Sequence, residues 1–105
     1  MARRYRVDIT RTAERDIDSI YDFIASDDPA AAEPWVEEVE RQISMLSRAP
    51  ARCPLIPEAG DLGRQYRHLL YGSYRTILRI DGSCVVVVRV IHGDRLLSLG
   101  ILQEP

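Results

Sequence analysis

The chain has 105 residues, 46% of them hydrophobic and 29% charged, and a formal net charge of −2. This is the composition of an ordinary soluble protein, and the length predicts that residues 1–105 form a single domain. No apolar run reaches the ~18 residues of a membrane-spanning helix and the opening residues lack a signal-peptide core, so we expect a cytoplasmic protein without membrane contact.

The first elements are predicted to be a strand and a helix. Alternating apolar and polar residues across Tyr5–Thr10 are typical of a half-buried strand. Apolar side chains then recur at helical spacing from Ala13 to Ile24. We expect Thr12 to cap this helix, which should end near Ser26-Asp27.

A second helix is predicted to follow at once. Asp28-Pro29 is a start signal, because Asp can cap a helix and Pro suits its first position. An apolar stripe comprises Trp35, Val36, Val39, Ile43 and Leu46. Pro34 interrupts the early turns, so we expect the regular helix to begin near Glu33. Pro50, Pro54 and Pro57 predict an irregular connection after it.

Three further strands complete the predicted fold: Gln65–Tyr71, Tyr74–Ile80 and Cys84–His92. Gly72-Ser73 and Asp81-Gly82 are hairpin signals between them. Val85–Val88 is apolar on both sides, which indicates a central strand covered on both faces. The order β-α-α-β-β-β predicts an α+β fold, with a helical hairpin packed on one face of a four-stranded antiparallel sheet.

Several motifs in this order resemble the RelE/ParE toxin superfamily of type II toxin–antitoxin systems. Asp28–Ala32 is similar to the turn between the two helices of these toxins. Near the C-terminus, Tyr66-Arg67, Tyr74–Ile80 and Val88–Arg95 resemble an Arg before the first hairpin, a tyrosine-rich strand and a closing strand that ends in His-x-x-Arg. The resemblance extends over residues 5–95.

This resemblance implies a toxin that inhibits growth, belongs to a plasmid-stabilisation type of locus and is neutralised by an antitoxin encoded by a neighbouring gene. The antitoxin's C-terminal segment would wrap around the toxin. The target would be DNA gyrase for the ParE-like branch, or ribosome-bound mRNA for the RelE-like branch.

Charge is distributed unevenly, and every basic residue is Arg. Residues 12–50 carry three Arg against ten acids, giving −7, whereas residues 64–95 carry six Arg against two acids, giving +4. Period-2 counting places Arg75 and Arg79 on one side of their strand. If Arg67 and Arg89 project to the same side, the sheet presents a basic face away from the helices.

That face would recognise carboxylates or phosphates. The predicted binding residues are Arg67, Tyr74, Arg75, Arg79, Arg89 and Arg95. The alternative is that these arginines form the solvated side of a half-covered sheet and pair with acids from elsewhere.

A RelE-like ribonuclease would need a base and cationic groups around the phosphate. His92 or His68 could be the base, with Arg67, Arg75 and Arg95 stabilising charge. Two departures favour the ParE-like branch. RNA-cleaving relatives often carry a second basic residue where this chain has Leu69, and a Tyr or His in the tail, whereas Leu96–Pro105 has neither. We therefore expect a toxin that acts by binding, without a metal or cofactor.

Overall fold

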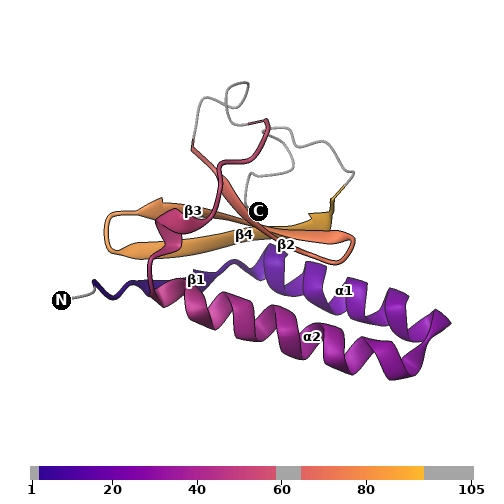
Figure 1. The fold of residues 1–105 in the computed structure, drawn as a ribbon. Coiled ribbons are helices and arrows are strands. Elements are labelled where there is room, and N and C mark those ends of the chain that lie inside the picture. The colour runs from indigo at the N-terminus through magenta and orange to yellow at the C-terminus, as the bar shows by residue number, and fades with distance from the viewer. Residues whose placement is uncertain (1–2, 59–64, 94–105) are drawn as a thin grey trace.

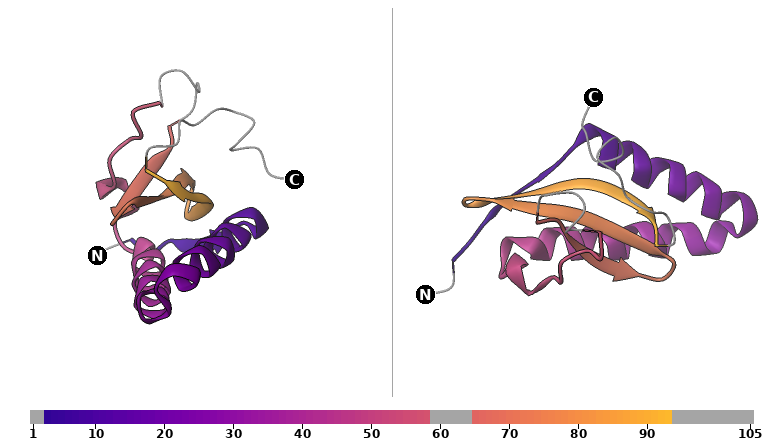
Figure 2. Two further views of the ribbon diagram at one scale, coloured as in Figure 1. Left: turned by 90° about the vertical axis from the view of Figure 1, so that its right-hand side faces the viewer. Right: turned by 90° about the horizontal axis from the view of Figure 1, so that it is seen from above.

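The structure is a computed structural model that describes residues 3–58 and 65–93 (Figure 1). The elements, in chain order, are β1 (Arg6–Ile9), α1 (Arg11–Asp27), α2 (Pro29–Ser44), two short 3₁₀ turns (Met45–Ser47 and Pro50–Arg52), β2 (Arg67–Tyr71), β3 (Tyr74–Asp81) and β4 (Cys84–His92). The two helices form an antiparallel pair that covers one face of the sheet (Figures 1 and 2). The predicted element order and fold class are confirmed.

The sheet is mixed, with strand order β1-β4-β3-β2. β2, β3 and β4 form an antiparallel meander, whereas β1 pairs with β4 in parallel, with Val7 opposite Val85. The prediction of an entirely antiparallel sheet is therefore wrong for this one pair. Alternation along Tyr5–Thr10 defines the two faces of β1 and not the direction of its neighbour. The path of the chain through the two helices sets that direction.

The main core lies between the helices and the sheet. It includes Ile17, Trp35, Val39, Ile43, Leu78, Val85 and Val87. A smaller cluster covers the opposite, outer face and contains Ile56, Tyr66, Ile77, Val88 and Ile91. Burial on both faces confirms the expectation that Val85–Val88 belongs to a central strand. The register shifts at Ile77 and Leu78, which face Arg89 and Val87, so Val88 is an extra residue in β4.

α2 begins four residues earlier than expected. Asp28 caps it, with its carboxylate accepting the Ala30 N–H at 3.2 Å, and the helix is continuous through Pro34. Pro34 removes only one helical hydrogen bond. The alanines before it favour the helix, and Ala32 is fully buried against the rest of the protein. Tertiary packing and the cap thus outweigh the proline.

Thr10, and not Thr12, caps α1. The Thr10 hydroxyl accepts the Ala13 N–H at 3.0 Å and donates to the Val88 carbonyl at 3.0 Å, which ties the helix start to β4. The Thr12 hydroxyl is buried and has no hydrogen-bond partner in the described part of the chain.

Thr10→Val is expected to lower the free energy of unfolding by about 1–2 kcal/mol, because it removes both the cap and the bond to β4. Thr12→Val should leave that free energy unchanged or raise it, because the buried hydroxyl it removes makes no hydrogen bond to residues 3–58 or 65–93. Urea unfolding of the two isosteric variants compares them directly. Equal midpoints for both would contradict the assignment of the cap.

Candidate functional site

Arg75 lies on the outer face of β3 and is buried there by an acid from the preceding connection. Its guanidinium forms a two-pronged ion pair with Glu58, with distances of 3.1 and 2.6 Å to the two carboxylate oxygens. The side chains are 5% and 13% exposed. In such a pair, two N–H donors of the planar guanidinium meet the two oxygens of the planar carboxylate. In this conformation, Glu58 occupies the donors that a bound anion would need.

His68 is enclosed on the same face of β2, opposite Ile77. Its Nδ1 atom has no hydrogen-bond partner within residues 3–58 and 65–93. Burial lowers the pKa of His68, and the nearby Arg75 charge lowers it further. The imidazole is therefore neutral at pH 7 and has the protonation state of a base, but the fold encloses it.

Arg67 projects to the other side of the sheet. It lies opposite Leu78, a member of the main core, and its guanidinium donates to the carbonyls of Ala51 at 3.2 Å and Cys53 at 2.6 Å. The predicted shared face of Arg67 and Arg75 is therefore wrong. Period-2 counting was correct within each strand, but the pairing register places the two arginines on opposite faces.

Arg89 forms an ion pair with Asp16 of α1. Its guanidinium donates to the two carboxylate oxygens of Asp16 at 2.7 and 2.9 Å, and the Val90 N–H donates to the same carboxylate at 3.0 Å. The hydrogen bonds with Asp16 raise the pKa of Arg89. β1 pairs with β4 only as far as Val87. Asp16 thus accepts a backbone hydrogen bond from β4 beyond the end of β1. Because its guanidinium is paired with Asp16, Arg89 does not extend a basic face.

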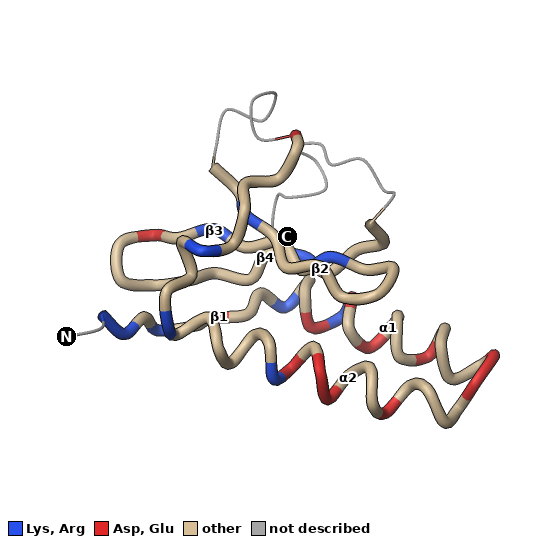
Figure 3. The backbone as a smooth tube through the Cα atoms, in the orientation of Figure 1, with Lys and Arg blue, Asp and Glu red and all other residues tan. Residues whose placement is uncertain are grey.

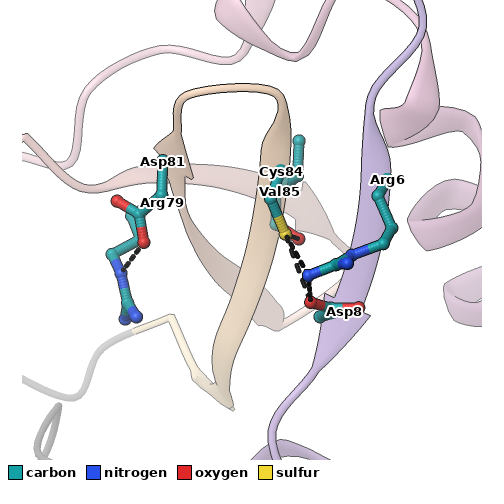
Figure 4. A network of polar contacts seen from close by, with 6 residues as sticks. All are labelled: Arg6, Asp8, Arg79, Asp81, Cys84 and Val85. Carbon is teal, nitrogen blue, oxygen red and sulfur yellow. Dashed lines mark hydrogen bonds and ion pairs between the residues drawn. The ribbon is translucent and has the colours of Figure 1, made fainter.

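Arg79 shares the outer face with Arg75 but lies toward the other end of β3. It pairs with Asp81 at 2.8 Å. Figure 4 shows this pair across β4 from a second one, Arg6 with Asp8 at 3.0 Å. The Cys84 thiol donates to Asp8 at 3.2 Å and, with Arg6, lowers the pKa of that carboxyl group. This end of the face carries alternating charges. The predicted site did not include the Arg6–Asp8 pair. Its sequence signal is the i, i+2 spacing of the two residues, which places both side chains on one side of a strand.

Tyr74 and His92 are packed together at the opposite end of the sheet. The Tyr74 ring makes edge contacts with Trp35 and His92, with centroid distances of 5.5 and 5.6 Å. Trp35 is buried, as expected for a core residue. The Tyr74 and His92 rings line a shallow hollow beside Phe23 of α1. Arg95 and the tail Leu96–Pro105 lie outside the described residues.

A groove that the sequence did not reveal opens between β1 and the two helices. It has a volume of about 360 Å³ and is lined by Val7, Ile9, Glu14, Ile17, Asp18, Glu40, Ile43 and Ser44. Its floor is apolar and its rim carries three carboxylates. Figure 3 shows that acidic residues are spread along both helices. Arginines lie in the segment around β1 and in the strands, and also in the helices at Arg11, Arg15 and Arg41.

Comparison with known proteins decides the family. The family model described as "ParE toxin of type II toxin-antitoxin system, parDE" matches residues 7–97. The chain belongs to the ParE toxin family. No curated protein matches its sequence.

Two solved structures resemble this ParE-family toxin. A chain of the chromosomal ParDE toxin–antitoxin system from P. aeruginosa has a TM-score of 0.68 and 20% identity, covering 86% of this chain and 97% of that one. A chain of the toxin–antitoxin complex RelBE2 from Mycobacterium tuberculosis has a TM-score of 0.54 and 31% identity, covering 85% and 98%. The first likeness is one of fold, and the second agrees with a superfamily that joins ParE and RelE toxins.

In this ParE-family toxin, the predicted binding residues that lie in the described part of the chain do not converge on one point. Arg67 is held by backbone carbonyls, and Arg75, Arg79 and Arg89 each have a carboxylate partner. Residues 3–58 and 65–93 include no cluster suited to a metal ion. None of the described helices is long and apolar enough to cross a membrane.

Proposed function

We propose that this ParE-family toxin arrests growth by binding DNA gyrase, and that an antitoxin encoded by a neighbouring gene neutralises it. Its place of action would be the cytoplasm, and a locus of this kind would serve plasmid stabilisation. The match of a ParE family model to residues 7–97 carries this proposal. Both solved relatives come from toxin–antitoxin systems, which supports an antitoxin partner.

The arrangement of the arginines supports binding over cleavage. Attack of a 2′-hydroxyl on a phosphate needs a base and several cations gathered around one phosphate. Here Arg67 and Arg75 lie on opposite faces of the sheet, His68 is enclosed, and the His92 ring packs edge-on against Tyr74. Among the described residues, the candidates for ribonuclease chemistry therefore do not surround a common point.

One observation favours a second candidate, a RelE-like ribonuclease that cleaves ribosome-bound mRNA. The chain is 31% identical to a chain of the RelBE2 complex, a higher identity than to the ParDE chain. In that case Arg67, Arg75, Arg95 and His92 would be the candidate catalytic residues, after a rearrangement that releases Arg75 from Glu58.

Expression of this chain alone in bacteria is expected to stop growth with filamentation and DNA damage, and co-expression of the neighbouring gene should restore growth. Purified toxin should inhibit gyrase supercoiling, and messages should stay intact. His92→Gln should leave the toxicity unchanged, because no catalytic base is involved. Codon-positioned mRNA cleavage that disappears in His92→Gln would instead support the ribonuclease. Normal growth at a verified soluble level would contradict both.

A further inference from the structure

Two arginines that are distant in the sequence lie side by side where the N-terminal segment passes the end of α2. Arg4 and Arg48 form an isolated antiparallel bridge, and the neighbouring Tyr5 N–H donates to the Ser47 carbonyl at 2.9 Å. Residues directly opposite in such a pair have their side chains on the same face, with Cβ atoms about 4.5–5.5 Å apart. Both arginines are exposed, so two guanidinium groups extend into solvent from one small area of the surface.

This pair of cations has no carboxylate partner in the part of the chain that the structure describes. Neither Arg4 nor Arg48 forms an ion pair with any of residues 3–58 or 65–93. Like charges placed directly opposite one another destabilise a strand pair. The bridge is therefore unfavourable by itself, and an anion lying over both guanidinium groups would relieve the repulsion.

Two further arginines flank the pair. The Arg3 guanidinium carbon lies 4.8 Å from the centroid of the Tyr5 ring, and Arg52 ends the 3₁₀ turn that follows Arg48. Ala49 starts this turn with a φ of 47° and is the only non-glycine residue with a positive φ among those described. A side chain with a Cβ is strained in that conformation, so the backbone is strained beside Arg48.

The surroundings of these arginines differ from those of the acidic residues. Figure 3 shows arginines on the N-terminal segment and on the chain that leaves α2, at one end of the molecule, whereas the acids of the two helices extend toward the other end. We call Arg3, Arg4, Arg48 and Arg52 the arginine patch. The whole chain has a net charge of −2, so a polyanion would be attracted to a local cluster of cations and not to the protein as a whole.

We propose that the arginine patch binds the phosphate backbone of duplex DNA. A guanidinium group fits the oxygens of a phosphate with two parallel hydrogen bonds. Duplex DNA carries about one negative charge per 1.7 Å of helix axis, so adjacent arginines such as Arg4 and Arg48 can meet neighbouring phosphates. Contacts of this kind position a protein on DNA without reading the bases, and we expect the binding to be independent of sequence.

Single-stranded nucleic acid fits the patch less well. Proteins usually bind it through aromatic rings on which successive bases stack. The ring beside the patch is that of Tyr5, which lies under the Arg3 guanidinium and packs against the main core. The choice of DNA over duplex RNA rests on the proposed function, because a toxin bound to DNA gyrase acts where duplex DNA is held. The inference goes further by giving the toxin its own contact with that DNA.

The test measures binding of the full-length toxin to a short labelled DNA duplex by fluorescence anisotropy, over a range of salt concentrations. Arg4→Gln/Arg48→Gln removes the central pair. Arg11→Gln/Arg15→Gln makes the same change in net charge at exposed positions of α1, beside Glu14. The patch variant is expected to bind about tenfold or more weakly at low salt, and the slope of log affinity against log salt should fall by about two. The control should stay close to the parent.

A charge-preserving variant and three other polyanions complete the design. Arg4→Lys/Arg48→Lys should keep most of the affinity, because lysine also binds phosphate as a point charge. Two unrelated duplex sequences should bind equally. Equal weakening in the patch variant and the control overturns the inference. Tighter binding of single-stranded DNA, duplex RNA or polyglutamate than of duplex DNA assigns the patch to a different partner and also overturns it.

The outcome can be separated from that of the proposed function. Parent toxin that inhibits gyrase supercoiling but binds no DNA duplex overturns this inference alone. Parent toxin that binds the duplex through the patch but leaves gyrase active supports the DNA contact and overturns the proposed target.

Discussion

Arg75→Ala is expected to destabilise the fold by about 3–5 kcal/mol, because it leaves the Glu58 carboxylate without its buried guanidinium. The two side chains are 5% and 13% exposed and the pair is two-pronged, so solvent screens it little. A domain of this size is stable by only about 5–15 kcal/mol. The urea midpoint should therefore fall steeply, as measured by circular dichroism.

Arg79→Ala is the matched control on the same strand and face. Its ion pair with Asp81 is 24% and 56% exposed, and its loss should cost only about 0–1 kcal/mol. A double change, Arg75→Met/Glu58→Leu, should recover much of the lost stability, because it removes both buried charges. Equal midpoints for Arg75→Ala and Arg79→Ala would show that the buried pair does not stabilise the fold.

This difference affects how the basic face should be tested. Weak partner binding by Arg75→Ala could follow from a destabilised fold and not from a lost contact. Arg79→Ala changes a partly exposed guanidinium on the same face and should keep the fold. Arg79→Ala is therefore the variant that reports on recognition by the outer face.

Asp16→Ala should be comparably destabilising, by about 3–5 kcal/mol. It removes the carboxylate partner of Arg89, whose side chain is 15% exposed, and also the acceptor of the Val90 N–H. α1 and β4 would then lose the polar contacts that Asp16 makes, and the hydrogen bond from the Thr10 hydroxyl to the Val88 carbonyl would remain. Thermal unfolding monitored by circular dichroism measures the loss.

Two variants of α1 serve as comparisons for Asp16→Ala. Asp16→Asn keeps an acceptor for Val90 but loses the charge, so its stability should be intermediate. Asp18→Ala, at an exposed position two residues along the same helix, should have little effect. If Asp16→Ala unfolds at the same temperature as Asp18→Ala, the connection between α1 and β4 does not depend on this carboxylate.

The sequence by itself determined the elements and their apolar faces. Asp28-Pro29 is a start signal that the structure uses, although we expected the regular helix only from Glu33. The hairpin glycines Gly72 and Gly82 have φ angles of 58° and 60°, as tight turns require. The apolar run Val85–Val88 predicted a strand buried on both sides. These features depend on residues close together in the chain, since capping, turn geometry and side-chain periodicity are local.

Only the tertiary structure decided which arginines are held by other groups of the chain and which strands pair with one another. Glu58 reaches Arg75, and Asp16 reaches Arg89 from the far end of the chain. The strand register places Arg67 opposite a core leucine, and β1 pairs with β4 in parallel. Each of these depends on register, strand direction or a contact distant in sequence. Side-chain alternation contains none of that information, because its period of two is the same for every register and either direction.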